Sequence, residues 1–460
     1  MNTIILISVI PIALLYLGLF KAKKALLPIS IIGLVVALGL AIAQWSQPDM
    51  AQPTFHGMLL FNNYSIVFSA VTILSTILIL LLSKGYFEKI SDHIAEYYAV
   101  MLFALAGIVV MVSYYNLTML FIGIEIMSVS LYILAGIKKN DFASNEAALK
   151  YFLMGAFSTG FLLFGITLIY GATGSFNLDG IRNYAVSTSH PDPIFYAGIA
   201  LIIVGLCFKV GAAPFHFWTP DVYEGAPTLI TTFMSTVVKT AGFAAFLRLF
   251  STCFAEVSSF WMPTVAIIAV ITLFVGNITA LYQQSFKRML AYSSISHAGY
   301  LLFAIIVIGG GSANAVFVYA TAYSIASIIA FGGLILVQQQ SGSEKFEAFN
   351  GLSAKNPFLA LVITIAMLSL AGIPLTAGFI GKFYMFNTAL TKYQFLLVIV
   401  AVVNAIASIF YYFRVIIAMY FRTAEGEEVV VPPYYKVVLA VSAIATIAIG
   451  IYPTLLSGLI

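Results

Sequence analysis

Four ionisable side chains interrupt long hydrophobic stretches of this 460-residue sequence. Glu125 lies in "FIGIEIMSVSLYIL", Lys209 in "FKVGAAPFHFWTP", Lys239 in "STVVKTAGF" and Lys382 in "LAGIPLTAGFIGKF". Carboxyl and amine groups take up and release protons, so this set favours a path for protons or ions. A charge at the centre of a membrane-spanning helix costs ~3 kcal/mol or more and normally faces protein groups or water. The alternative is a structural ion pair that locks two helices together.

The composition predicts an integral membrane protein surrounded by lipids. Hydrophobic residues make up 62% of the chain and charged residues 8%, whereas soluble domains are roughly 45–50% apolar. The net charge of +4 is too small and dispersed to indicate a nucleic-acid partner. Cys207 and Cys253 both lie in apolar runs, so we expect neither a disulfide framework nor a cysteine metal site.

Fourteen apolar runs are long enough to cross a bilayer, whose ~30 Å core needs about 20 residues per helix. The twelfth run is long because Gly372 and Pro374 interrupt it. The fold class is therefore an all-α polytopic membrane protein. The runs are 3–20, 25–45, 64–83, 97–113, 115–136, 147–171, 194–212, 229–250, 261–282, 289–309, 313–338, 358–390, 394–421 and 434–457.

The basic residues predict the orientation of these runs. If the N-terminus is outside and each run crosses once, only Arg182 and Lys392 lie in outer connections, which is a strong positive-inside asymmetry. Both termini are then on the outer side, and the first run is not a cleaved signal peptide. Arg248 and Arg414 lie near the ends of spans and are expected to reach the interface. The fourteen inner residues are Lys21, Lys23, Lys24, Lys84, Lys89, Lys138, Lys139, Lys150, Lys287, Arg288, Lys345, Lys355, Arg422 and Lys436.

Two of the runs are broken near a lysine. Pro214 ends the seventh run after Lys209, and Lys382 follows the break at Gly372 and Pro374, so the two lysines are expected at matched positions. Irregular backbone at membrane depth is tolerated where it is buried in protein or lines water, and transporters build ion sites there. Five runs separate the breaks, which predicts two inverted five-helix repeats, runs 4–8 and 9–13. Residues 1–460 then form one membrane domain, with three first helices (1–96), two repeats (97–250 and 261–421) and a last helix (434–457).

Three stretches, "FKVGAAPFHFWTPDVYEGAPT", "FKRMLAYSSISHAGY" and "LAGIPLTAGFIGKF", resemble subunit N of the bacterial proton-pumping NADH:quinone oxidoreductase, respiratory complex I. The resemblance covers nearly the whole chain and implies fourteen helices with the seventh and twelfth broken. Lys382 favours the N type over the M type, which has a glutamate on the twelfth helix. The end of the chain at Ile460 favours it over the L type, which continues into a long lateral helix.

The resemblance implies a proton path along the middle of the membrane, coupled to NADH oxidation and quinone reduction. Its residues would be Glu125, Lys209, Lys239 and Lys382. The carboxylate of Glu125 is expected to hold the amine of Lys209 protonated. When that carboxylate no longer acts on the amine, Lys209 would release its proton toward Lys239, and the proton would then pass to Lys382 and the outer side. We expect no cofactor in this chain, because it has no Gly-rich phosphate loop after a strand and no cysteine cluster.

The expected partners follow from the same resemblance. They are the other membrane and peripheral subunits of complex I, including the neighbouring antiporter-like subunit. Those partners would hold flavin mononucleotide, the iron–sulfur clusters and quinone. The expected location is the bacterial inner membrane, although a plastid relative would have a similar sequence.

Five further residues have two readings each. His216 lies in the first break, where it could relay protons or fix the loop. His297 lies where the second repeat would mirror Glu125, and this position favours a proton relay over packing. Lys150 could load protons but is more simply a positive-inside anchor. Asp221 and Glu224 could cap the helix after the break or lie at the inner mouth of the path.

Two other classes of function fit the sequence. An Mrp-like cation/proton antiporter subunit would use the same broken helices and lysines without a redox partner. A purely structural membrane scaffold would tolerate neutralisation of the buried lysines.

Overall fold

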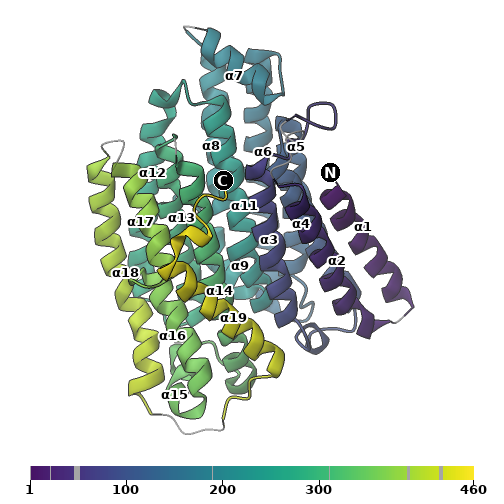
Figure 1. The fold of residues 1–460 in the computed structure, drawn as a ribbon, viewed down its shortest axis with the longest axis vertical. Coiled ribbons are helices and arrows are strands. Elements are labelled where there is room, and N and C mark those ends of the chain that lie inside the picture. Colours follow the sequence, from purple (N-terminus) through teal and green to yellow (C-terminus); the bar gives the residue numbers. More distant parts are fainter. Residues whose placement is uncertain are drawn as a thin grey trace.

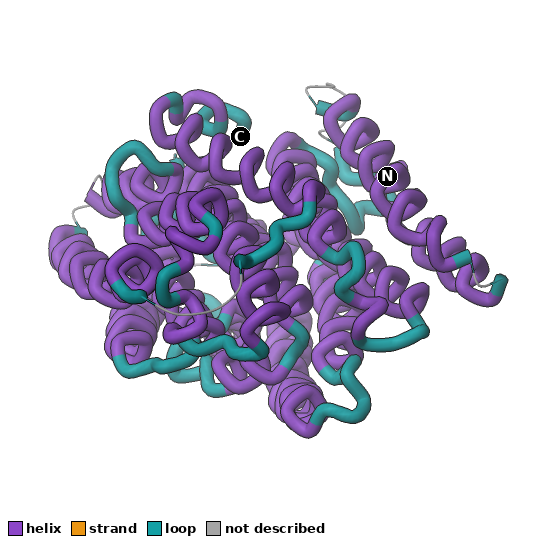
Figure 2. The backbone as a smooth tube through the Cα atoms, turned by 90° about the horizontal axis from the view of Figure 1, so that it is seen from below, coloured by secondary structure: helices purple, strands orange, loops and turns teal. Residues whose placement is uncertain are grey.

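The computed structural model describes residues 2–20, 22–45, 52–188, 190–309, 311–390, 394–423 and 428–460. Lys21 and Lys392, which belong to the predicted charge pattern, lie outside these residues. Figures 1 and 2 show a bundle of helices side by side, with no strand among the described residues beyond isolated bridges. The predicted all-α architecture is confirmed.

Each of the fourteen predicted runs coincides with one helix or with a broken helix. Among the described residues, thirteen helices are long and apolar enough to cross a membrane, and α16 with α17 makes the fourteenth crossing. The single-helix crossings are α1 (Asn2–Leu19), α2 (Lys23–Ala43), α3 (Asn63–Leu82), α4 (Ile94–Ser113), α5 (Leu117–Ala135), α6 (Phe142–Thr173), α12 (Ser258–Leu281), α13 (Phe286–Ile306), α14 (Ser312–Ser341), α18 (Phe395–Phe421) and α19 (Pro433–Ile451).

Three crossings are interrupted. The seventh consists of α8 (Pro193–Val210) and α9 (Trp218–Gly225), and the twelfth of α16 (Pro357–Ala371) and α17 (Ala377–Leu390). Both predicted breaks are confirmed. The eighth crossing, for which no interruption was predicted, contains a π-helical turn, Met234–Val238, between α10 (Thr228–Phe233) and α11 (Lys239–Cys253).

Local sequence signals place the ends of these helices. Asp192 and Asn356 accept hydrogen bonds from the backbone of the first turns of α8 and α16, and a proline follows each of them. A side-chain acceptor before a proline is a strong start signal, because the acceptor satisfies a free N–H group and proline needs none. Left-handed glycines end α8 and α16 at the breaks, at Gly211 and Gly372.

Contacts between connections confirm the predicted alternation of crossings. On the predicted inner side, Lys23 pairs with Asp92 at 2.6 Å, and Ser285 bridges to Lys345. On the predicted outer side, Asn116 bridges to Asn177. A missing or extra crossing would have put these connections at opposite ends of the bundle. Figure 1 shows the opposite ends clearly, with α7 (Leu178–Ser187) at the top and the short α15 (Leu352–Lys355) at the bottom.

The amphipathic helix α7 was not predicted, because it is too short and polar to register as a span.

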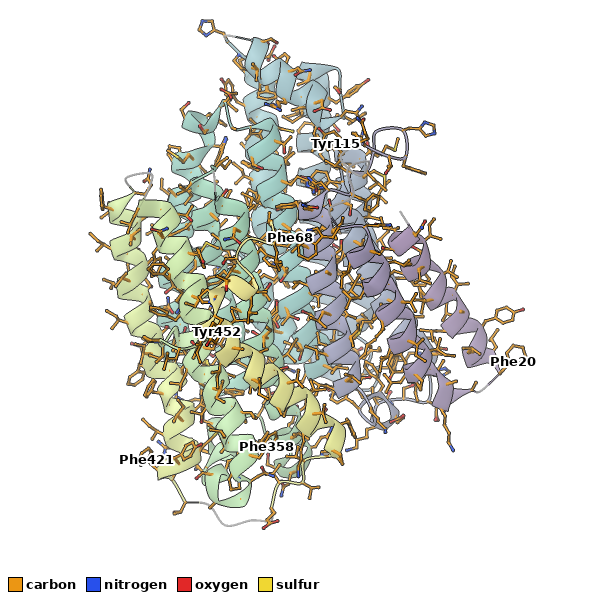
Figure 3. The ribbon with its side chains drawn as sticks, viewed as in Figure 1. Phe20, Phe68, Tyr115, Phe358, Phe421 and Tyr452 are labelled. Carbon is orange, nitrogen blue, oxygen red and sulfur yellow. The ribbon has the colours of Figure 1, made fainter. Side chains whose placement is uncertain are left out.

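Hydrophobic side chains cover the outside of the bundle instead of being confined to its core. Phe20 and Phe421 are 73% and 80% exposed, and Figure 3 shows both at the periphery. Such faces suit lipid or other membrane subunits.

The order of packing partners recurs along the chain. α4 packs closely against α5, as α12 does against α13. α6 contacts both halves of the first broken helix, as α14 does with the second. This recurrence is the one expected of the predicted repeats, whose boundaries remain a prediction.

Candidate functional site

Lys209 is held by side chains from two neighbouring helices. Its amine donates hydrogen bonds to Ser128 Oγ on α5 (2.9 Å) and to Thr159 Oγ1 on α6 (3.2 Å). Glu125 lies one helical turn before Ser128 and interacts electrostatically with Lys209, without a direct ion pair. One carboxylate oxygen of Glu125 is buried and has no hydrogen-bond partner among the described residues. Glu125 and Lys209 are thus close enough to interact electrostatically, while the amine of Lys209 is held by hydroxyl groups.

The first break is stabilised by groups that replace helical hydrogen bonds. Gly211 has φ 72°, and Trp218 Nε1 donates to the carbonyl oxygen of Phe208 at 3.0 Å. The Trp218 ring stacks on Tyr151 at 4.7 Å between ring centroids. His216 is buried in this break with its ring beside Phe217. The position of His216 fits either of its two readings.

Lys239 lies at the most enclosed position of the four. It directly follows the π-helical turn and is 4% exposed. Its amine donates to the carbonyl oxygen of Ser294 on α13 at 2.5 Å and also to the hydroxyl of Ser294. A π-helical turn shifts the register of a helix and is common at functional sites.

His297 is close enough to Lys239 and Lys382 for the charges of both lysines to act on it. Its ring nitrogens are hydrogen-bonded to the hydroxyls of Tyr319 (Nδ1, 2.7 Å) and Tyr412 (Nε2, 3.1 Å). A cavity of about 10 Å³ beside the ring is at the lower limit for one water molecule. His297 is thus near both lysines, and its role as a relay stays a prediction.

Lys382 folds back onto its own broken helix. Its amine donates to the carbonyl oxygens of Leu370 (3.1 Å) and Ala371 (2.7 Å), which end α16. Carbonyl groups at the end of a helix have no intrahelical donors and attract cations. Gly372 has φ 84°, and a Cβ there would lie 2.7 Å from Lys382 Cδ, so both the turn and the lysine require glycine.

Each of the two broken helices has a lysine near its break, as expected, but the two lysines lie on opposite sides of their breaks. Lys209 lies two residues before the left-handed glycine of its break, whereas Lys382 lies ten residues after the corresponding glycine. The repeat therefore places both amines near a break, but on different half-helices.

None of the four expected residues forms an ion pair with any other described residue. The amines of the three lysines instead contact hydroxyl and carbonyl groups. This argues against the structural ion pair as their reason for being in the membrane.

Charged groups at the inner end of the bundle hold α9 on both sides. Lys150 on α6 pairs with Asp221 (2.7 Å) and with Glu146 (2.8 Å), and Arg288 on α13 pairs with Asp221 (3.1 Å) and Glu224. Neither acid caps a helix, so that reading was wrong; both are partners of basic residues.

Lys287 was counted only as a charge in an inner connection, but it is 3% exposed. Its amine donates to the carbonyl oxygens of Glu224 (2.8 Å) and Ala226 (2.6 Å) at the end of α9. Its position near the start of a run gave no sign of this contact, because the partner carbonyls belong to a distant segment.

Arg248 does not reach the interface as expected. It is 7% exposed and donates to Tyr114 O (3.1 Å), Asn62 Oδ1 (3.0 Å) and Ser65 Oγ (2.7 Å). These acceptors satisfy the guanidinium within the protein. Arg414 does extend to the inner connection, where it donates to Gln283 O at 2.8 Å.

Comparisons with known proteins agree with this geometry. Residues 114–408 match the family described as NADH:quinone oxidoreductase/Mrp antiporter, TM. The chain is 42% identical over 99% of its length, and 98% of the relative, to NADH-quinone oxidoreductase subunit N of Cytophaga hutchinsonii.

Solved structures agree as well. A chain of respiratory complex I from Thermus thermophilus is 32% identical, with a TM-score of 0.82 and 98% of both chains covered. A chain of the Mrp complex from a Dietzia species has the same fold, with a TM-score of 0.87, 20% identity and coverage of 99% of this chain and 95% of that one. Both solved structures are of multi-subunit complexes. The chain therefore belongs to the NADH:quinone oxidoreductase/Mrp antiporter membrane family and, within it, to the subunit N group of NADH-quinone oxidoreductase.

Proposed function

We propose that this chain carries a proton path through the middle of the membrane as part of a proton-translocating NADH:quinone oxidoreductase. The observation that carries the proposal is the series Glu125, Lys209, Lys239, His297 and Lys382. The hydrogen-bond partners of the lysines and of His297 are hydroxyls and carbonyls, and no ion pair with a described residue fixes the charge of any group in the series.

The order of groups suggests the direction of transfer. Glu125 acts on Lys209 without contacting it, so a shift of α5 would change the environment of Lys209 without breaking a salt bridge. A proton leaving Lys209 would pass to Lys239 and, by way of His297, to Lys382. Lys382 lies on the half-helix that runs to the predicted outer side. The pathway would therefore release protons toward that side.

The redox chemistry belongs to partners in this proposal. Flavin mononucleotide, iron–sulfur clusters and quinone would be held by other membrane and peripheral subunits, with a second antiporter-like subunit as a neighbour. Glu125 and Lys209 are partly exposed in the single chain, next to the exposed hydrophobic face of α5. That face would contact another membrane subunit.

An Mrp-like antiporter remains the second candidate, because the Dietzia structure has the same fold at 20% identity. The 42% identity to a subunit N favours the redox complex. The two differ in what should co-purify. A redox complex predicts NADH:quinone reductase activity in the preparation, whereas an antiporter complex predicts cation/proton exchange without it.

Lys239 provides the test of the pathway. Lys239→Ala removes the titratable group, and Lys239→Arg keeps the charge but does not release its proton. Both should lower proton pumping and coupled NADH:quinone turnover by tenfold or more, on the order of an acid–base contribution, while the complex still assembles on a native gel. Lys436→Arg, an exposed position at the inner end, serves as the matched control. Normal pumping in Lys239→Arg would remove this residue from the pathway.

We also propose that the chain lies in a bacterial inner membrane with both termini outside. A cysteine introduced at Ser343, with Cys207 and Cys253 replaced, should resist an impermeant thiol reagent applied to the outer surface of spheroplasts. A cysteine at Thr454, on the opposite side, should react. The reverse labelling pattern would invert the topology, and the reaction of both positions would refute the crossing count.

A further inference from the structure

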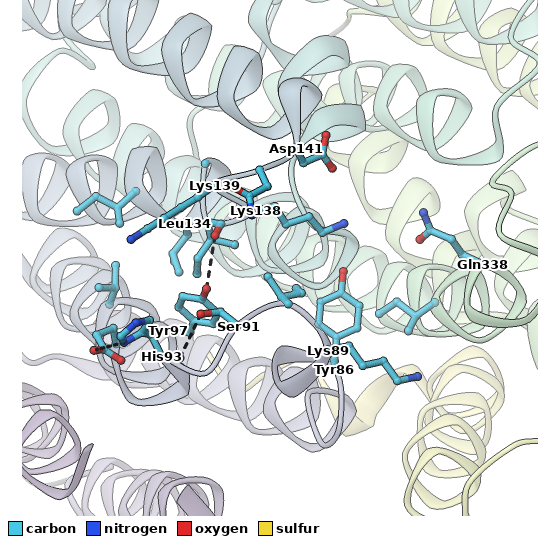
Figure 4. A pocket seen from close by; sticks show the side chains of 18 of the residues that line it. Tyr86, Lys89, Ser91, His93, Tyr97, Leu134, Lys138, Lys139, Asp141 and Gln338 are labelled. Atoms are coloured by element: carbon cyan, nitrogen blue, oxygen red, sulfur yellow. Dashed lines mark hydrogen bonds and ion pairs between the residues drawn. The ribbon is translucent and has the colours of Figure 1, made fainter. Parts of the chain in front are cut away.

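A cavity of about 1060 Å³ opens at the inner end of the bundle, away from the residues of the proposed pathway. Its walls come from the connection after α3, the start of α4, the connection between α5 and α6, and the end of α14. Figure 4 shows this cavity from close by. Its volume is at the upper end of the range of roughly 300–1,000 Å³ typical of ligand sites.

Amines line opposite walls of the cavity. Lys138 and Lys139 lie on one wall, and Lys89 lies with Tyr86 on the other (Figure 4). Lys89 donates a hydrogen bond to Gln339 at 3.3 Å. The side-chain amines of Lys138 and Lys139 make no hydrogen bond or ion pair within the described part of the chain. Two cationic groups are therefore available to a ligand.

The acids of the lining already have partners. Glu96 pairs with His93 at 3.4 Å, and Asp141 accepts a hydrogen bond from the Ala143 N–H at the start of α6 at 3.0 Å. Neither contact removes the charge of its carboxylate, but the three lysines of the lining, Lys89, Lys138 and Lys139, outnumber its two acids. The charge of the cavity thus favours an anion.

Part of the remaining lining is apolar and continues onto the exposed face of α5. Val100, Leu134, Ile137 and Ile335 line the cavity beside Ile133. Ile133 is 56% exposed, and it heads a stripe along one face of α5 whose other members are also exposed. Steps of three and four residues keep a stripe on one helical face. The stripe continues through Val129 (49%), Ile126 (39%) and Ile122 (39%).

We propose that this cavity binds the headgroup of an anionic phospholipid, with an acyl chain lying along the stripe of α5, between this chain and the neighbouring membrane subunit of the proposed function. The amines would bind the phosphate, and the two tyrosines of the lining, Tyr86 and Tyr97, lie at the depth where aromatic side chains favour a membrane interface. Basic pockets between helices at this end of membrane proteins suit such headgroups. A soluble phosphate would use the amines but not the stripe.

The test uses the assembled complex, purified in mild detergent with its native lipids. Lys138→Gln combined with Lys139→Gln should reduce the anionic phospholipid retained per complex, measured by mass spectrometry of extracted lipid, about fivefold for each charge removed. Lys138→Arg with Lys139→Arg should retain it, because guanidinium also binds phosphate. The control is Lys24→Gln with Lys436→Gln, which removes the same charge from exposed positions at the same end outside the cavity.

A second measurement distinguishes the possible occupants. In nanodiscs of phosphatidylcholine, added phosphatidylglycerol should raise the melting temperature of the wild-type complex but not that of the double glutamine variant, and inorganic phosphate should change neither. A rise with inorganic phosphate would indicate a soluble anion and overturn the proposal. Equal lipid retention in all variants would also overturn the proposal. If the double glutamine variant lost a neighbouring subunit on a native gel while its lipid content stayed unchanged, the cavity would belong to a protein partner instead.

Discussion

The two broken helices use the same backbone device but position their lysines by different means. At the first break, Lys209 extends sideways to hydroxyls on α5 and α6, two helices that are separate from its own. At the second break, Lys382 returns to the carbonyl end of its own crossing. Movement of a neighbouring helix can therefore change the partners of Lys209, whereas the partners of Lys382 persist as long as the break itself does.

The second halves of the two crossings differ as well. α9 is held at the inner end by Lys150 and Arg288 through ion pairs, and by Lys287 at its final carbonyls. Within the described residues, α17 has no ion pair of this kind. At the first break, the lysine bonds to other helices and the following half-helix is fixed by ion pairs. At the second break, the lysine bonds to its own crossing and the following half-helix is held by packing.

The largest effect is expected at Lys382. Lys382→Ala should lower coupled NADH:quinone turnover and proton pumping by about tenfold or more, because no other described amine contacts the carbonyl end of α16. Proton uptake by inverted membrane vesicles, alongside a native gel, measures both pumping and assembly. If Lys382→Ala pumped normally while Lys209→Ala did not, the second break would have no place in the pathway.

A smaller effect, confined to the second break, is expected for Gly372→Ala. The new Cβ would meet Lys382 Cδ at 2.7 Å, and the left-handed backbone costs an alanine about 1–2 kcal/mol. We expect turnover to fall severalfold, with the complex still assembled. Gly342→Ala is the matched control, since it has φ 68° and open space around the added carbon. Equal losses in the two variants would show that backbone strain alone is responsible.

The smallest effect is expected at the ion pairs around α9. Arg288→Ala should reduce turnover by a few fold, because each of the two partly exposed ion pairs that it removes contributes roughly 0–1 kcal/mol. The wild-type activity should approach that of the variant as ionic strength rises, since salt screens such pairs. Arg414→Ala, which removes an arginine from the same end without breaking an ion pair, is the comparison. If the activity of Arg288→Ala were as low as that of Lys382→Ala, Arg288 would do more than hold α9 in place.

Much of the architecture follows from the sequence because the bilayer imposes simple rules. Each crossing needs about twenty apolar residues, and basic residues gather on one side, so the crossings and their alternation could be predicted from composition alone. The two breaks were predictable because Gly–Pro combinations within a span cannot continue a helix. Glu125, Lys209, Lys239 and Lys382 could be singled out because a charge in an apolar run is costly and rare.

Only the tertiary structure decided which groups these charges meet. The π-helical turn before Lys239 has no composition signal, and the partner of Lys239, Ser294, lies 55 residues away. Lys287 and Arg248 looked like residues of helix ends, yet both are buried because distant segments bring carbonyl and hydroxyl oxygens to them. The apolar pattern specifies which segments enter the membrane, but hydrophobicity has no direction. The position of each hydrogen bond depends on how the helices pack, and that packing is settled only when the whole chain has folded.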